Sequence, residues 1–407
     1  MSTIDAPVGE RERLDYLDIL RGFAVLAIFV VNIKAMFQPF AFYSNATLWA
    51  GEYDVTIAAI QAFLVEDKWR TIFTALFGAG LALIAEKAAA RGHDSLGLLS
   101  RRLFFLLIFG LMHLLLMWMG DILTIYALTG FLAMWFRNAA AKSLRRWFIG
   151  CLVVAFLWTG AFAILPAEIP EIRAEVEPML WGTDPAYLEK STSEMLAGVG
   201  EQIATRVGMA GEFIAMYFLA GGFWLQTLGI MLAGMWAYRT GYLTGKLPLS
   251  AYAKAAIIGA LIAVGLDTTR WLTLNAQGWT FDAYSWTQPL NMLDGYAGAV
   301  AWSGIVGVLV KLGWRARAFA ATGRMAFTNY IACTLIGTTL ANGHGFGLFG
   351  APTNLQLMGV VLATWLAVLI WSPLWLARFR FGPLEWLWRS LTYGRVQPFQ
   401  RRVAQTV

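Results

Sequence analysis

The chain has 407 residues, of which 58% are hydrophobic and 14% are charged, and only two are cysteine. Soluble domains carry about 25% charged residues, and a soluble fold of this length could not bury so much apolar surface. The composition excludes a soluble globular protein, a disordered chain and a disulfide-stabilised scaffold. It is typical of a protein that crosses a membrane several times.

Ten segments are long and apolar enough to span a bilayer, which takes about 20 mostly apolar residues. They are residues 17–37, 69–87, 102–120, 122–138, 146–165, 212–238, 251–272, 296–313, 325–343 and 357–379. Segment 55–66 is apolar but short, and we expect an interfacial or re-entrant helix there. The predicted fold class is therefore all-α, a polytopic helical membrane protein with about ten transmembrane helices.

The distribution of Lys and Arg predicts the orientation of these spans. Basic residues concentrate in cytoplasmic loops, and most of the 31 Lys and Arg lie in alternate segments of the chain. We assign these segments to the cytoplasm, together with both termini: 11–21, 87–102, 137–146, 239–254, 311–324 and 378–402. The net charge of +6 is then mostly a topology signal, with some attraction to anionic lipids. No nucleic-acid partner is expected.

The whole chain, residues 1–407, is predicted to form a single transmembrane domain with two extramembrane parts. Residues 166–211 form one long acidic outer loop, interrupted by Pro166, Pro170 and Pro178. We expect this loop to be a solvated cap, and a lid over an outward-facing acceptor site is the alternative. Residues 380–407 form a basic cytoplasmic tail.

Three polar side chains share one stripe of the first predicted span. Burying such groups unpaired in a bilayer costs about several kcal/mol, so each is a candidate for a site. Asp18 and Arg21 can pair at i, i+3 near the cytoplasmic edge, as a structural anchor or as part of a binding site. Asn32 lies about 16–17 Å further along the helix than Arg21. It would make a helix–helix hydrogen bond or take part in catalysis.

His113 occupies the corresponding place in the third span. It follows Arg102 by the same separation that joins Arg21 to Asn32, so we expect His113 and Asn32 at similar depth. Neutral imidazole is a base that a low-dielectric site tolerates. We therefore favour a general base or proton carrier over a structural histidine. Asp121 would cap the next helix, orient His113 or bind the acceptor, although about 12 Å between them on one continuous helix makes direct pairing with His113 unexpected.

Two further groups of polar residues lie in or beside the spans. Thr328, Asn329 and Tyr330 begin the ninth span, where they would join helices by hydrogen bonds or line a site. The second group lies at the predicted outer ends of the helices and comprises Lys34, Glu66, Asp67, Arg70, Asp267, Arg270 and His344. We expect a carboxylate such as Glu66 or Asp67 to pair with Lys34 and Arg70. A polar acceptor site at that face is the alternative.

The chain resembles the YeiB family of bacterial membrane proteins over almost its whole length. The motifs that carry the resemblance are LDILRGFAVLAIFVVNI at 17–33, FTALFGAG at 73–80, RRL at 101–103, GLMH at 110–113, GDILTIYALTG at 120–130, GRMAFTNY at 323–330 and FGPLEWLWRSLTYGRVQP at 381–398. Family members usually carry Gln soon after the TNY, where this chain has Cys333.

The opening pattern, LD-x-LRG followed by an intramembrane Asn, is similar to that of transmembrane acyltransferases. These include the acyltransferase-3 proteins that modify cell-surface glycans and the lysosomal heparan glucosaminide acetyltransferase. In the latter, an Asn late in the first span and a histidine act at the acyl-transfer centre. The resemblance gives that role to Asn32. No His follows Asn32 within the next sixty residues, so His113 would have to act from another span.

The residues and the resemblance together suggest an acyltransferase of the bacterial inner (plasma) membrane. It would move an acyl group from cytoplasmic acyl-CoA or acetyl-CoA to a hydroxyl or amine of a lipid, glycan or small molecule at the outer side. The expected catalytic residues are His113, Asn32 and Asp121. The expected donor-binding residues are Arg21, Arg101, Arg102, Arg324, Asn329 and Tyr330. The histidines and cysteines are too scattered for a metal site, and none is expected.

Two other function classes remain open. A secondary transporter or flippase for a small or amphipathic solute would use the same Asn32 and His113 to bind solute, and His113 with Asp121 to carry protons. The third class is a structural or signalling protein. This class gives no reason for Asn32 and His113 to lie at the same depth. Membrane lipids are expected partners in every case, and a homodimer is left open.

Overall fold

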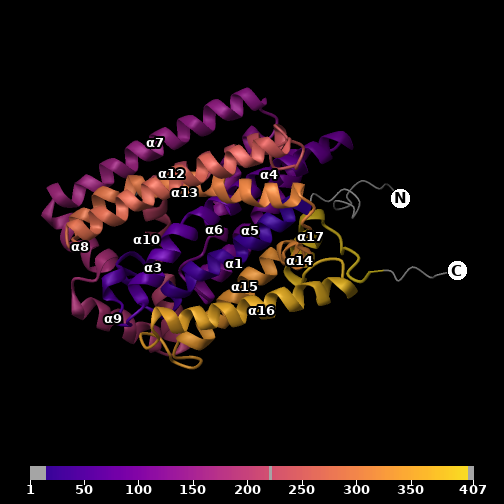
Figure 1. Cartoon of the computed structure of the whole chain (residues 1–407). Coiled ribbons are helices and arrows are strands. Elements are labelled where there is room, and N and C mark those ends of the chain that lie inside the picture. Colours follow the sequence, from indigo (N-terminus) through magenta and orange to yellow (C-terminus); the bar gives the residue numbers. More distant parts are fainter. Residues whose placement is uncertain (1–14, 220–221, 402–407) are drawn as a thin grey trace.

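The computed structural model describes residues 15–219 and 222–401, and Figure 1 shows their arrangement. Arg11, Arg13 and Arg402, which we assigned to the cytoplasmic side, lie outside these residues. In the described part all regular structure is helical, apart from one isolated bridge between Phe379 and Gln400. The helices are α1 (Asp15–Phe37), α2 (Ala41–Ser44), α3 (Asp54–Leu64), α4 (Lys68–Ala90), α5 (Ser95–Leu116), α6 (Leu123–Ala133), α7 (Ala141–Glu168), α8 (Pro170–Trp181), α9 (Pro185–Leu196), α10 (Val199–Leu219), α11 (Phe223–Arg239), α12 (Leu249–Ala276), α13 (Phe281–Lys311), α14 (Arg317–Arg324), α15 (Ala326–Ala341), α16 (Asn354–Arg378) and α17 (Pro383–Tyr393), with short 3-10 turns at Ala46–Leu48 and Met134–Phe136.

Seven helical segments of the described chain are each long and apolar enough to cross a membrane. They are Tyr16–Phe37, Asp54–Ala90, Ser95–Leu116, Ala141–Pro166, Leu249–Ala276, Phe281–Lys311 and Asn354–Arg378. An eighth candidate is the pair Val199–Phe218 and Phe223–Arg239, bent by 63°. Leu123–Phe136 and Ala326–Ala341 are apolar but shorter. The ten predicted segments thus recur as helices, but two are short and the predicted span 212–238 is divided between α10 and α11.

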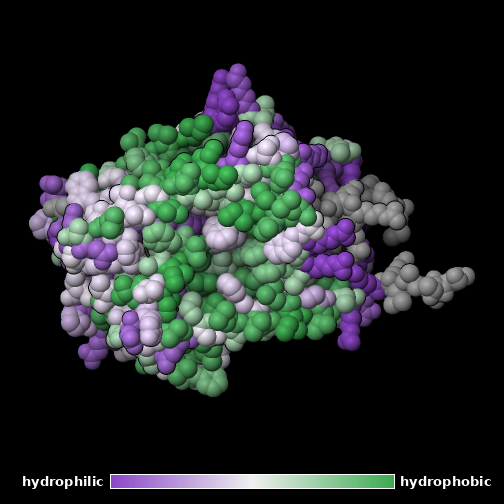
Figure 2. Space-filling model, viewed as in Figure 1, coloured by the Kyte–Doolittle hydropathy of each residue, from purple (hydrophilic) through white to green (hydrophobic). Residues whose placement is uncertain are grey.

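Apolar side chains cover the middle of the molecule, and polar side chains gather at its two ends (Figure 2). Leu157 on α7, Leu261 on α12 and Leu366 on α16 are each more than 60% exposed. A soluble protein rarely leaves so wide an apolar surface uncovered, whereas lipid chains match it. The protein is an all-α polytopic membrane protein, as predicted.

The two ends of the molecule carry different helices (Figure 1). We name the end with α14 and α17 the inner end and the end with α8 and α9 the outer end, after the predicted orientation. The predicted outer loop 166–211 is helical through most of its length. Pro170 begins α8, whereas Pro166 and Pro178 lie inside helices, so these two do not interrupt the loop as expected. The tail from residue 380 contains α17, which packs on α5 and α15.

Close helix crossings hold α1 at the centre of the bundle. α1 packs against α4, α13, α14, α15 and α16. A side chain at Gly22 would collide with the Phe319 carbonyl of α14, and one at Gly323 with the Asp18 carbonyl of α1. Gly78, in the motif FTALFGAG, meets the Met231 carbonyl of α11 in the same way. Small residues at these points let helix backbones approach closely, which is the main source of attraction between helices in lipid.

Candidate functional site

His113 and Asp121 form a hydrogen-bonded pair, with Nδ1 and Oδ1 separated by 2.8 Å. Both side chains are buried, with 1% and 2% of their surface exposed. The expectation that they would not pair directly is wrong, because it assumed one continuous helix. α5 ends at Leu116, and the chain then turns back before α6 begins. The turn returns Asp121 to the level of His113.

The same carboxylate also caps α6. It accepts hydrogen bonds from the backbone N–H of Leu123 at 3.1 Å and of Thr124 at 2.7 Å. The two roles weighed for Asp121, a helix cap and a partner of His113, are therefore both present. The cap fixes the carboxylate, and the carboxylate favours the imidazole tautomer with its proton on Nδ1. Nε2 is then the free basic nitrogen.

Nε2 of His113 lies 3.1 Å from the hydroxyl of Thr334 on α15. The same hydroxyl is 3.3 Å from the carbonyl oxygen of Tyr330, to which it can donate. The Tyr330 ring stands 5.2 Å from the imidazole, centre to centre. His113 thus points at a hydroxyl from a position that Asp121 determines, which is the arrangement of a general base.

Arg206 of α10 supports this site from the outer end. Its guanidinium donates to the carbonyls of Leu115 and Leu116, which end α5, at 3.0 and 3.2 Å. These carbonyls have no partner within the helix, and the Arg206 donors satisfy them where the chain turns toward Asp121. Sequence analysis missed this residue, because it lies in the predicted outer loop, where an arginine is normally solvated.

Asn32 lies on α1, half-buried, and makes no side-chain hydrogen bond to any other residue in the described part of the chain. Its neighbours on α1, Phe29 and Met36, approach Gly337 of α15. Gly337 is one helical turn from Thr334, the hydroxyl that His113 contacts. α15 therefore lies against both residues, although no hydrogen bond joins Asn32 directly to His113.

The basic residues predicted at the inner end fall into two neighbouring groups. Arg21 pairs with Asp18 at 3.0 Å, as expected, on the helix that packs along α14 and its Arg324. Arg102 lies over the ring of Trp388 on α17, with 3.5 Å between the guanidinium carbon and the ring centre. Arg101 is exposed beside it.

These two groups are close enough to interact. Arg102 lies within electrostatic range of Arg21 and of Arg389 on α17. Asp18 already pairs with Arg21, so this proximity shows only that the basic side chains lie near one another. It joins the two groups of basic residues into one region of the inner end.

Asn329 uses its whole amide inside the protein. It donates to the carbonyl of Thr322 and to the hydroxyl of Ser372, both at 3.1 Å, and accepts from the indole of Trp371 at 2.9 Å. It is fully buried. Of its two interpretations, a hydrogen bond between helices accounts for every one of these contacts.

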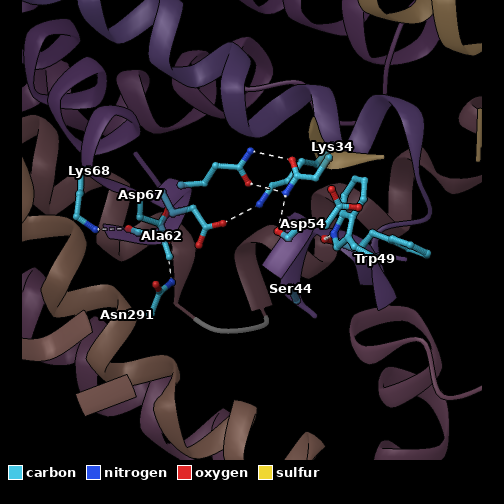
Figure 3. A network of polar contacts seen from close by, with 12 residues as sticks. Lys34, Ser44, Trp49, Asp54, Ala62, Asp67, Lys68 and Asn291 are labelled. Carbon is cyan, nitrogen blue, oxygen red and sulfur yellow. Dashed lines mark hydrogen bonds and ion pairs between the residues drawn. The ribbon is translucent and has the colours of Figure 1, made fainter. Parts of the chain in front are cut away.

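The predicted outer group is largely present as ion pairs, and Figure 3 shows where Lys34 and Asp67 of this group lie. Lys34 contacts Glu66 at 2.7 Å and Arg70 contacts Asp67 at 2.8 Å, which confirms the pairing expected from the sequence. Asn291 of α13 donates to Asp67 at 2.9 Å (Figure 3).

Lys68 forms a second buried charge group beside these pairs. Its ammonium contacts Asp267 at 3.1 Å and Asp294 at 2.5 Å. It also donates to the carbonyl of Ala62 at 2.7 Å, the contact drawn in Figure 3. Lys68 is 1% exposed, and the two aspartates are almost as deeply buried. Sequence analysis missed Lys68 and Asp294, although an aspartate in the apolar helix 281–311 was a usable signal. His344, placed in this group by the sequence, is exposed in a loop.

Comparison with known proteins identifies relatives over the full length of the chain. The family described as "Protein of unknown function (DUF418)" matches residues 237–395. The "Uncharacterized protein YeiB" of Escherichia coli (strain K12) is 32% identical over 403 residues, covering 95% of this chain and 98% of that protein. The chain belongs to the YeiB family. The "Uncharacterized protein YxaH" of Bacillus subtilis (strain 168) is 29% identical, covering 97% of this chain and 98% of its own.

The family relationship covers both candidate sites of this YeiB-family chain. Residues 237–395 include Asp267, Asp294 and Thr334, and the full-length alignments also cover the part that contains His113 and Asp121. Both relatives are named as uncharacterized proteins, so function has to be argued from the geometry.

Proposed function

We propose that this YeiB-family protein is an acyltransferase of the bacterial inner membrane, with His113 as its general base. It transfers an acyl group from cytoplasmic acyl-CoA or acetyl-CoA to a hydroxyl or amine acceptor at the outer side. The observation that carries the proposal is the buried series from Asp121 through His113 to the Thr334 hydroxyl. A carboxylate on Nδ1 and a hydroxyl on Nε2 is the arrangement that activates hydroxyl nucleophiles.

The proposed reaction uses His113 twice. The Thr334 hydroxyl turns fully to the Tyr330 carbonyl, which it already contacts. The hydroxyl or amine of the acceptor then becomes the partner of His113 Nε2. Nε2 removes the acceptor proton as the acceptor oxygen or nitrogen bonds to the thioester carbonyl carbon. The carbon–sulfur bond then breaks, and the imidazolium returns its proton to the leaving thiolate of CoA. Asp121 stabilises the imidazolium between these steps.

The donor is proposed to enter from the inner end. Arg21, Arg101, Arg102 and Arg324 supply guanidinium groups there, which suit the phosphates of CoA. Asn32 has an amide free to donate to the oxyanion that develops on the thioester carbonyl, an effect worth about 3 kcal/mol in other enzymes. Asn329 already uses both amide hydrogens, so we place the pantetheine contact on Tyr330.

Incubating the purified protein with radiolabelled acetyl-CoA and total membrane lipid or glycan tests this proposal. His113→Ala and Asn32→Ala are expected to lower labelling at least about 100-fold. His344→Ala, which changes an exposed histidine outside the site, is the matched control and should label normally. Equal labelling by His113→Ala and the control would sink the assignment.

One observation favours a second candidate, a proton-coupled transporter. Two aspartates share the single ammonium of Lys68 inside the membrane-spanning part, with Arg270 near Asp267, and buried carboxylates of this kind are common sites of proton exchange in transporters. Proton-driven uptake by proteoliposomes without acyl-CoA would support this candidate. Asp294→Asn should then abolish uptake while His113→Ala retains it.

A further inference from the structure

A small pocket at the outer end lies apart from His113. It is bounded by α2, α3 and the ends of α1 and α12; its closed part has a volume of only about 20 Å³, and a wide open mouth brings the empty space to about 320 Å³. Its charged lining residues are Lys34, Glu66 and Arg270, and its aromatic ones are Phe42, Tyr43, Trp271 and Trp279. A concave surface with convergent polar groups among aromatic side chains is the usual form of a small-molecule site.

The charged lining of this pocket consists of two cations and one carboxylate. Glu66 lies between two cations, with Oε1 at 2.7 Å from Lys34 and Oε2 at 3.8 Å from Arg270. The nearby Asp267 also interacts with Arg270, but it is committed to Lys68 at 3.1 Å. Arg270 therefore lies near two carboxylates, but the Glu66 oxygen is 3.8 Å from its guanidinium, beyond hydrogen-bonding distance.

Arg270 has hydrogen-bonding capacity that the protein does not use. Its Nε is buried and has no hydrogen-bond partner within residues 15–219 and 222–401. Only 8% of the residue is exposed, so water cannot easily satisfy it. A buried guanidinium donor without an acceptor is costly, and a carboxylate or phosphate oxygen is the acceptor that it binds most strongly.

Aromatic and hydroxyl groups complete the lining. Trp271 and Trp279 pack edge to face, with ring centres 5.1 Å apart, and Lys34 lies 5.1 Å from the centre of the Tyr43 ring. Burial, together with the nearby carboxylates of Asp67 and Glu66, raises the pKa of Tyr43 well above its ordinary value. Tyr43 is therefore protonated at neutral pH and can donate a hydrogen bond.

We infer that this pocket binds a small organic anion, whose carboxylate or phosphate group meets Arg270 and Lys34 while its body lies against the aromatic residues. The inference does not depend on acyl transfer. The same anionic chemistry is available from a soluble molecule or from a lipid headgroup, and the experiment below separates the two.

Thermal unfolding of the full chain in neutral phosphatidylcholine nanodiscs tests the inference. The soluble probes are glucuronate and glucose 1-phosphate, with glucose as the neutral control, and phosphatidylglycerol nanodiscs supply the lipid headgroup. We expect at least one anion to raise the unfolding temperature in a saturable way, and glucose to leave it unchanged. Arg270→Gln should raise the half-saturating concentration at least tenfold, and Arg270→Lys should raise it less.

Arg173→Gln is the matched control, because Arg173 is an outer-end arginine that lies outside the pocket and pairs with Glu177 and Asp282. The Arg173→Gln variant should bind the anion with the same half-saturating concentration as the unchanged protein. The inference is overturned if no anion stabilises the protein, if glucose stabilises it equally, or if Arg270→Gln binds as well as the Arg173→Gln control. Binding is measured without acyl-CoA, so its failure leaves the proposed transfer reaction separately testable.

Discussion

The carboxylate of Asp121 both caps a helix and contacts the imidazole of His113. Its Oδ1 contacts both His113 and the N–H of Leu123, and its Oδ2 contacts the N–H of Thr124. Side-chain capping of a helix is common and structural, whereas a carboxylate on a buried imidazole sets that base's orientation and tautomer. The cap holds the carboxylate in the position from which it can orient His113.

Asp121→Asn separates these two roles. The amide oxygen can still accept from His113 and Leu123, so we expect a loss of only about 1 kcal/mol in stability from the weakened cap. Acyl transfer should fall by about 10²–10⁴-fold, because the amide does not stabilise the imidazolium. Thermal unfolding and labelling with radioactive acetyl-CoA measure the two effects. Asp184→Asn is the control, since Asp184 caps α9 in a similar way outside the site; equal activity in both variants would contradict the assigned role.

Lys68 is a buried cation that joins α4 to two aspartates of α12 and α13. Removing one partner of a buried ion group leaves unpaired charges in a low-dielectric interior. Lys68→Met is therefore expected to lower the free energy of unfolding by about 3–5 kcal/mol. Adding Asp267→Asn and Asp294→Asn should recover most of that loss, as seen by thermal unfolding in detergent. Lys246→Met, at an exposed inner position, should change little, and a triple variant no more stable than Lys68→Met would refute the charge argument.

At the scale of elements, α15 carries Thr334 toward His113, and its start is held from another helix. Glu385 of α17 accepts from the backbone N–H of Phe327 at 2.7 Å and of Thr328 at 3.0 Å, and from the Thr328 hydroxyl at 2.6 Å. These are the first backbone donors of α15, which have no partner within the helix. Glu385, although distant in sequence, therefore caps the N-terminus of α15.

The pKa of Glu385 gives this cap a testable pH dependence. Burial raises the pKa of its carboxyl above the ordinary value, and the hydrogen bonds from Thr328 and Phe327 partly offset that rise. The folded state then binds this proton more tightly than the unfolded state, so the contribution of Glu385 to stability falls as pH rises from the ordinary pKa through the raised one.

Glu385→Gln should keep the cap and remove this pH dependence. The amide oxygen of the glutamine can accept from both N–H groups but does not titrate. The difference in unfolding free energy between the unchanged protein and Glu385→Gln should therefore fall as pH rises from about 4 toward neutrality. Glu385→Ala leaves two buried N–H groups without a partner and should cost about 1–3 kcal/mol at every pH. Unfolding temperatures across that pH range measure both effects. A glutamine variant with the same pH profile as the unchanged protein would refute the linkage.

At the scale of the whole molecule, an apolar belt separates an inner end rich in basic residues from an outer end that carries the acidic helices 166–211 (Figure 2). This difference in charge between the two ends bears on both the proposed acyl transfer and the proposed anion binding. The residues proposed to bind acyl-CoA lie at the inner end, and the pocket proposed to bind an anion lies at the outer end. Their separation suits a protein that handles different molecules at its two faces.

Cysteine labelling tests the orientation. Cys151 and Cys333 are buried, so an exposed cysteine introduced by substitution should dominate the reaction with a membrane-impermeant maleimide. Glu189→Cys, on α9, should react in intact cells whose outer membrane admits the reagent. Lys142→Cys, at the start of α7, should react only after the inner membrane is opened. The reverse pattern would show that the assignment of inner and outer ends is inverted.

The most predictable contacts were the ion pairs that helical spacing or the cost of unpaired charge in a membrane requires. The Asp18–Arg21 pair follows from helical spacing, and the pairing of Lys34 and Arg70 with Glu66 and Asp67 follows from the cost of unpaired charge in a membrane. The pairing of His113 with Asp121 was not predicted, because it depends on where α5 ends. The nearest glycine, Gly120, comes four residues after Leu116, so it does not mark where α5 ends.

The sequence by itself determined the class of the protein. Long apolar segments have no stable place except lipid, and burying a charge there is so costly that the few polar residues in the spans are conspicuous. Only the tertiary structure decided which of those residues meet. Asp267 and Asp294 belong to different helices that converge on Lys68, and Glu385 reaches α15 from α17. Such contacts depend on how helices cross and where chains turn, and helical periodicity constrains neither.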